Sequence, residues 1–236
     1  MDLAIQLGAY LIGIPLQLLT ISVLLRGGYR RFPLIFLYVV VSFLATIAEM
    51  PLSFTFLTTQ RSFSRLFRTI YYADEIILQV LIFAVVISLI YEATARLGPR
   101  RLLRTGLVAG AIVVALVSFA FHYVPNAPRY GVWMVPWLRD LKFCATIFVL
   151  ALWAFLISSK KKDHLLLMLS GALGILFTGE AIGESLQHLA TPNQITWLSR
   201  AGSLILLAVN IAFLYLWWAA FRQEAHQRTA PRTAHP

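Results

Sequence analysis

Long apolar segments alternate with short polar segments along the whole chain. The seven apolar segments cover residues 3–25, 33–50, 69–91, 106–123, 138–158, 165–187 and 197–220. Each is close to the length of roughly 17–25 residues that an α-helix needs to cross the hydrocarbon core of a bilayer. The pattern therefore predicts an all-α integral membrane protein, in which residues 1–221 form a bundle of seven transmembrane helices.

The composition agrees with this class of protein. Hydrophobic residues make up 59% of the chain and charged residues 13%, whereas a soluble domain carries about 25% charged residues. With seven predicted spans in 236 residues, little of the chain is left for a soluble catalytic or binding domain. Residues 222–236 are rich in Gln, Thr, Ala, Pro and His, and this composition favours a disordered cytoplasmic tail.

The basic residues are concentrated on one side of the predicted bundle. If the N-terminus is outside, 13 of the 20 basic residues but only three of the ten acidic residues fall on the inner side. The positive-inside rule then places the N-terminus outside and the C-terminus in the cytoplasm. We expect a multi-pass protein of a bacterial plasma membrane. Because topology and attraction to anionic lipid explain the short basic segments, nucleic-acid binding is a poor interpretation of the charge.

Ionisable and polar side chains gather near the outer ends of several spans. An ionisable side chain inside a span is costly to bury, so each one is a candidate for a functional site. Tyr71, Glu75 and Gln79 share one face of the third span, because helical neighbours recur at every fourth residue. The candidate ligand-binding residues are Glu49, Tyr71, Asp74, Glu75, Gln79, His122, Asp140, Glu180, Glu184, His188 and Arg200.

The sixth span carries the densest polar pattern. Glu180, Glu184 and His188 follow one another at every fourth residue, which makes them one slowly drifting stripe on a helix. Gly179 and Gly183 form a GxxxG pair beside that stripe, and such a pair lets a neighbouring helix approach closely. The span therefore combines a helix-packing face with a candidate binding face.

Three functions are compatible with this polar layer. We favour an outward-facing acidic pocket that binds a small cationic or polar ligand, in a protein of sensing or signalling type. Proton- or cation-coupled transport is an alternative, because clustered carboxylates can act as proton relays. However, Gln17 and Asn210 are nearly the only strongly polar residues expected in the middle of the membrane, so the sequence shows no continuous polar path for transport. The other alternative is a structural or partner-binding membrane subunit, in which the polar groups only hold helices together.

Neither a metal nor a cofactor can be assigned from the sequence, and we favour a protein that is not an enzyme. Glu180, Glu184, His188 and His122 offer zinc ligands, but the chain has neither an HExxH nor an HxxxH pair. A haem would have only His122 and His188, both at the ends of spans. Seven spans with an outer N-terminus resemble microbial rhodopsins and G-protein-coupled receptors. The seventh span nevertheless lacks a lysine for retinal, and no NPxxY motif begins at Asn210.

Overall fold

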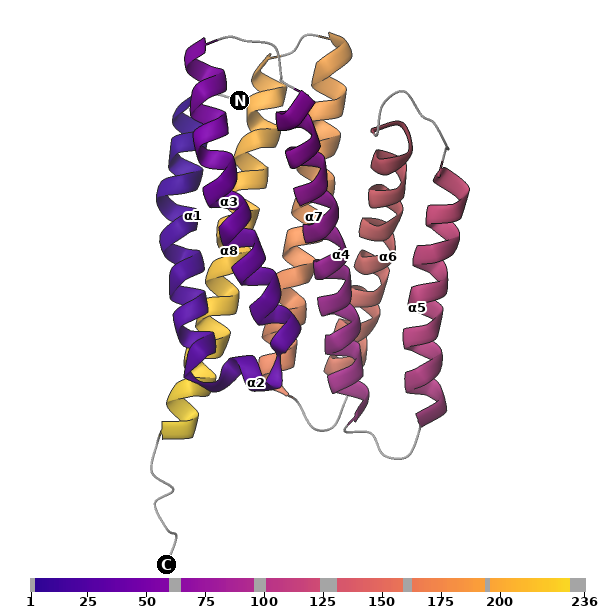
Figure 1. Ribbon diagram of the computed structural model, residues 1–236. Helices are drawn as coiled ribbons and strands as arrows, with labels where there is room; N and C mark the ends of the chain where they lie inside the picture. The colour runs from indigo at the N-terminus through magenta and orange to yellow at the C-terminus, as the bar shows by residue number, and fades with distance from the viewer. Residues whose placement is uncertain are drawn as a thin grey trace, which may run out of the picture. The chain divides into compact units, whose positions relative to one another are not determined.

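The computed structural model is built from α-helices, and it describes residues 3–59, 65–95, 101–123, 131–158, 163–193 and 196–229. The helices over these residues are α1 (Leu3–Val23), η1 (Leu24–Gly28, a π-helix), α2 (Tyr29–Arg31), α3 (Pro33–Thr59), α4 (Arg65–Ala95), α5 (Arg101–His122), α6 (Gly131–Ser158), α7 (His164–Asn193) and α8 (Thr196–Thr229). Figure 1 shows this helical architecture, which confirms the predicted all-α class for the described residues.

Six helical stretches in the described part of the chain are long and apolar enough to cross a membrane. They are Leu7–Arg31, Pro33–Pro51, Tyr72–Thr94, Pro136–Ser158, His164–Ala190 and Thr196–His226. The remaining predicted span, 106–123, corresponds to a shorter apolar stretch, Val108–His122, inside α5. The lengths and composition of these helices suggest a multi-pass membrane protein, and a crossing by α5 stays a prediction.

The last helix extends beyond the predicted seventh span. The sequence predicts a span that ends at residue 220 and a disordered tail from residue 222, whereas α8 continues to Thr229. Two side chains of this extension make contacts within the protein. Glu224 pairs with Arg31, and the guanidinium of Arg222 lies over the ring of Trp218. These two contacts stabilise the helical conformation of the first residues of the expected tail.

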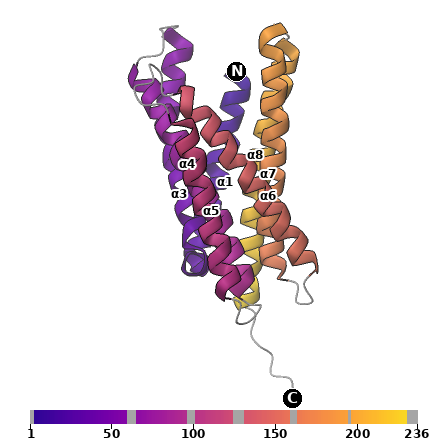
Figure 2. The same ribbon diagram turned by 90° about the vertical axis from the view of Figure 1, so that its right-hand side faces the viewer.

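The chain divides into two compact units. The terminal unit comprises Met1–Phe43 and Lys161–Pro236, and the central unit comprises Leu44–Lys160. In the terminal unit, α7 and α8 run antiparallel side by side, and α1 packs against α8 (Figure 1). In the central unit, α5 runs opposite to α4 and α6 and packs against both (Figure 2).

Glycines allow the close approach of α7 and α8. A Cβ atom on Gly179 would overlap the side chain of Val209, and one on Gly183 would lie 2.7 Å from Cγ of Leu206. The carbonyl oxygen of Gly202 would lie only 3.1 Å from that second Cβ. Small residues serve this purpose in membrane helices because they let two backbones come together. The GxxxG pair of α7 is therefore a packing face, and its partner is α8.

An aromatic core joins the beginning of α3 to α8. Trp217 is fully buried, and its Nε1 donates a hydrogen bond to the carbonyl oxygen of Leu169 at 3.4 Å. The Trp217 ring centroid lies 4.3 Å from that of Phe213 and 5.8 Å from that of Tyr38. Tilted and edge-on contacts of this kind are the favourable geometries for aromatic rings. These contacts hold α3, α7 and α8 together near the end of the terminal unit where η1 and α2 lie.

A tight turn of the chain lies between α1 and α3. Gly27 within η1 has a φ of 125°, a left-handed conformation that glycine adopts without the steric penalty of a Cβ. After it, the backbone N–H of Phe32 donates to the carbonyl oxygen of Gly28 at 3.0 Å. This turn places α2, and with it Arg31, beside the ends of α7 and α8.

Candidate functional site

In the central unit, one acidic side chain of α3 lies within electrostatic reach of two acidic side chains of α4. Glu49 is on α3, Asp74 and Glu75 are on α4, and all three are half-buried. The carboxylate of Glu49 is close enough to both other carboxylates to interact with them electrostatically. We call these three residues the acidic cluster. Carboxylates grouped among apolar helices are costly, because burial strips their water and like charges repel.

Gln79 adds a hydrogen-bond donor on the same helix as two of these acids. It lies one turn along α4 from Glu75, and its side chain is 6% exposed. Its Nε2 has no hydrogen-bond partner among the described residues. A buried polar group left in this state costs roughly 1–3 kcal/mol, so the site favours an added acceptor atom. Such an acceptor would come from water or from a ligand.

For Tyr71, the third residue of the predicted polar face of α4, the structure describes the backbone alone. Its position in helix α4 is part of the structure, whereas its side chain lies outside the described residues. The expected contribution of its phenol to the face of Glu75 and Gln79 therefore stays a prediction.

His122 and Asp140, two further predicted site residues, are paired with each other. The Nε2 of His122 lies 3.0 Å from Oδ2 of Asp140, and the Ser118 hydroxyl donates to the same oxygen at 2.9 Å. The side chains of His122 and Asp140 are 32% and 40% exposed. Because serine bonds to the aspartate and not to the histidine, the arrangement differs from a nucleophile–base–acid triad. Its evident effect is to join α5 to α6.

Aromatic contacts also join α5 to α6. The ring of Phe119 lies 5.2 Å from that of Trp137 and 5.7 Å from that of Trp133. The Nε1 of Trp137 donates to the carbonyl oxygen of Ala115 at 3.3 Å. The α5–α6 interface is thus held by polar and aromatic contacts together.

The other predicted site residues belong to the terminal unit. On α7, Glu180 is half-buried, whereas Glu184 and His188 are exposed. Arg200 is exposed near the start of α8. Next to them, Nε2 of Gln187 donates to the Ser203 hydroxyl at 3.1 Å. That these side chains share one layer with the acids of the central unit stays a prediction.

The zinc site considered from the sequence gains no support from the geometry. Within the described residues, no three or more His, Cys, Asp and Glu side chains are grouped so that they could hold a metal ion. We therefore assign no metal ligand.

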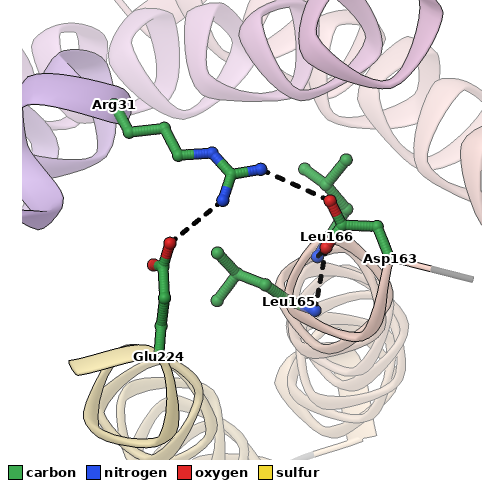
Figure 3. A network of polar contacts seen from close by, with 5 residues as sticks. All are labelled: Arg31, Asp163, Leu165, Leu166 and Glu224. Carbon is green, nitrogen blue, oxygen red and sulfur yellow. Dashed lines mark hydrogen bonds and ion pairs between the residues drawn. The ribbon is translucent and has the colours of Figure 1, made fainter. Parts of the chain in front are cut away.

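A polar network at the opposite end of the terminal unit is not evident from the sequence (Figure 3). The Arg31 guanidinium lies between two carboxylates, with Nη2 3.3 Å from Oδ2 of Asp163 and Nη1 3.0 Å from Oε1 of Glu224. The other oxygen of Asp163, Oδ1, accepts from the backbone N–H groups of Leu165 and Leu166 at 3.1 and 3.2 Å. Asp163 is therefore the N-cap of α7 and also an ion-pair partner. The sequence offers one signal for this network: Asp163 and Glu224 are two of only three acids in the segments that carry 13 of the 20 basic residues.

Comparison of the chain with protein-family models, with curated proteins and with solved structures found no match. The functional assignment therefore depends on the geometry and chemistry of the chain itself.

Proposed function

We propose that the protein is a seven-helix receptor-like membrane protein that binds a small cationic ligand at the acidic cluster of its central unit. The observation that carries this proposal is the grouping of Glu49 with Asp74 and Glu75 in half-buried positions. A bound cation compensates such charges where water is scarce. Binding at this place would then be a means of sensing the ligand from outside the cell.

The chemistry around the cluster suggests what the ligand looks like. The carboxylates favour a protonated amine or a metal cation, and the buried amide of Gln79 favours a hydrogen-bond acceptor. A small amine that also carries a hydroxyl or carbonyl oxygen satisfies both. We therefore favour an amino alcohol or a similar small amine over a simple metal ion.

The proposed topology has seven crossings, with α5 as the fourth, the N-terminus outside and the C-terminus in the cytoplasm. The excess of basic residues on the inner side supports this orientation. It places Glu49, Asp74 and Glu75 toward the outer surface of a bacterial plasma membrane. A ligand would then reach the cluster from outside the cell.

The direct test is a thermal-shift measurement on the full chain in detergent. The probes are ethanolamine, Na⁺ and Ca²⁺, each titrated at constant ionic strength. Saturation at about 100 times the dissociation constant stabilises a protein by roughly 2.7 kcal/mol, which is a measurable rise in melting temperature. We expect ethanolamine to raise the melting temperature at concentrations at which Na⁺ has no effect.

The variants Glu49→Gln and Asp74→Asn keep the shape of the side chains and remove their charge. We expect both to abolish the response to ethanolamine while leaving a folded protein. Glu92→Gln, near the other end of α4, is the matched control and should respond like the parent chain. If both cluster variants keep the full response, or if none of the three probes shifts the parent protein, the binding proposal is wrong.

A second candidate function is that of a structural or partner-binding subunit, and the pairing of His122 with Asp140 favours it. In that case the polar residues would serve helix packing alone. Glu49→Gln would then alter the melting temperature without any change in the response to added cations.

A further inference from the structure

We propose that a groove on the terminal unit, between α1 with η1 and α8, binds the phosphate-bearing headgroup of an anionic phospholipid. The groove has a volume of about 460 Å³. The residues that carry the argument are Leu19, Ser22 and Arg26 on one wall and Trp218, Arg222 and His226 on the other. This site is separate from the acidic cluster, which belongs to the central unit.

The groove holds two permanent positive charges. Among the described residues, neither Arg26 nor Arg222 has a carboxylate partner. The guanidinium of Arg222 lies 5.0 Å from the ring centroid of Trp218, a cation–π contact that orients it beside the indole. Arg31, by contrast, is already neutralised by its two acidic neighbours. An anion entering the groove would therefore meet charges that are still available to it.

The geometry of α8 separates the basic and acidic faces of its last turns. Arg222 and His226 are four residues apart and so lie on one face, which lines the groove. Glu224 lies two residues from each of them, about 200° around the helix, and pairs with Arg31. The carboxylate thus points away from the groove, and the cations are left concentrated within it.

The walls of the groove change from apolar to basic along its length. Leu19 is 47% exposed, and Arg26 follows seven residues later, a rise of about 10 Å along a helix. The same order occurs on α8, where Trp218 precedes Arg222. A free phosphate ion makes no favourable contact with an apolar wall. A phospholipid, by contrast, carries a phosphate next to its acyl chains, so it can contact the basic and the apolar parts of the groove together. The sequence of apolar and then basic side chains on both walls, together with the two arginine charges, therefore favours a phospholipid over a free phosphate ion.

The test uses the full chain, purified in a neutral detergent. The probes are phosphatidylglycerol, the zwitterionic lipid phosphatidylcholine, and inorganic phosphate. Bound lipid is counted by native mass spectrometry, and the melting temperature is measured in parallel. We expect phosphatidylglycerol to bind and to raise the melting temperature, with both effects weakening as salt rises. Phosphatidylcholine and inorganic phosphate should leave the melting temperature unchanged at the same concentrations.

The variant Arg26→Gln/Arg222→Gln removes both charges of the groove. Each arginine near an anionic surface contributes about fivefold to binding, so the double variant should bind phosphatidylglycerol roughly 25-fold more weakly. Arg30→Gln is the matched control, because Arg30 lies near the same end of the unit but stacks on Tyr29 and does not line the groove. It should bind like the parent chain.

Several outcomes would overturn the lipid site. One is equal binding of phosphatidylcholine and phosphatidylglycerol to the parent chain. Another is an equal loss of phosphatidylglycerol binding in Arg30→Gln and in the double variant. A third is a rise in melting temperature with inorganic phosphate alone, which would show an anion site without lipid specificity. If the double variant does not fold, the proposal is tested instead by the effect of salt on phosphatidylglycerol binding to the parent chain. Binding that does not change with salt concentration would reject the proposal.

Discussion

Arg31 and Glu224 are 193 positions apart in the chain, yet Nη1 of Arg31 lies 3.0 Å from Oε1 of Glu224. The same guanidinium reaches Asp163 at the start of α7. One side chain thus connects the segment after α1 to the beginning of α7 and to the last turns of α8. These side chains are only 13–25% exposed, so the pairs are better shielded from water than ordinary surface ion pairs.

The first prediction concerns this connection. Arg31→Gln removes the guanidinium that pairs with two partly buried carboxylates, and we expect it to destabilise the protein by about 1–3 kcal/mol. The measurement is the melting temperature in detergent, with Arg30→Gln as the exposed control of equal charge. Equal melting temperatures for the two variants would show that the connection does not contribute to stability.

The second prediction separates the two roles of Asp163. Asp163→Asn keeps an oxygen that can accept from the N–H groups of Leu165 and Leu166, but it loses the charge that pairs with Arg31. Asp163→Ala loses both and gives up an N-cap that is worth about 0.5–2 kcal/mol. We expect the melting temperature to fall further for alanine than for asparagine. An equal fall would mean that capping contributes nothing measurable.

The third prediction concerns the packing of α7 on α8. A methyl group at Gly179 collides with Val209, so Gly179→Ala should destabilise the protein by about 1–3 kcal/mol. The double variant Gly179→Ala/Val209→Ala should regain part of this loss, because the second substitution opens space. The melting temperatures of the two variants are compared in the same detergent.

Gly110→Ala supplies the control for this comparison. Gly110 lies inside α5, and nothing lies within 4 Å of the Cβ that alanine would add. Alanine is the better helix former by about 0.5–1 kcal/mol, so this variant should be neutral or slightly more stable. Equal losses for Gly179→Ala and Gly110→Ala would contradict the close approach of α7 and α8.

The fourth prediction concerns topology. The segments around Arg30, Arg100 and Lys161 and the C-terminal tail should be cytoplasmic, because 13 of the 20 basic residues lie in these four segments. In a Cys144→Ala background, Lys161→Cys should be labelled by an impermeant thiol reagent only after the cells are opened. Asn126→Cys, in the segment expected to be outside, should be labelled in intact cells. Labelling of position 161 in intact cells would reverse the proposed orientation.

The sequence determined the helical class, because apolar segments of 18 or more residues have few other stable forms in a bilayer. It also showed the packing role of Gly179 and Gly183, since small residues at that spacing place two backbones in contact. It identified Glu49, Asp74 and Glu75 as acids inside spans, and depth along a helix follows directly from residue number.

Only the tertiary structure decided which side chains meet. His122 and Asp140 were both candidate ligands by sequence, but the packing of α5 on α6 pairs them with each other. Residues 222–229 have the composition of a flexible tail, yet they continue α8, with Glu224 held by Arg31. The physical reason is that composition and periodicity report only on local preference and burial. Partners distant in the chain, such as Arg31 and Glu224, are brought together by the turn at Gly27 and by the packing of α1 and η1 against α8.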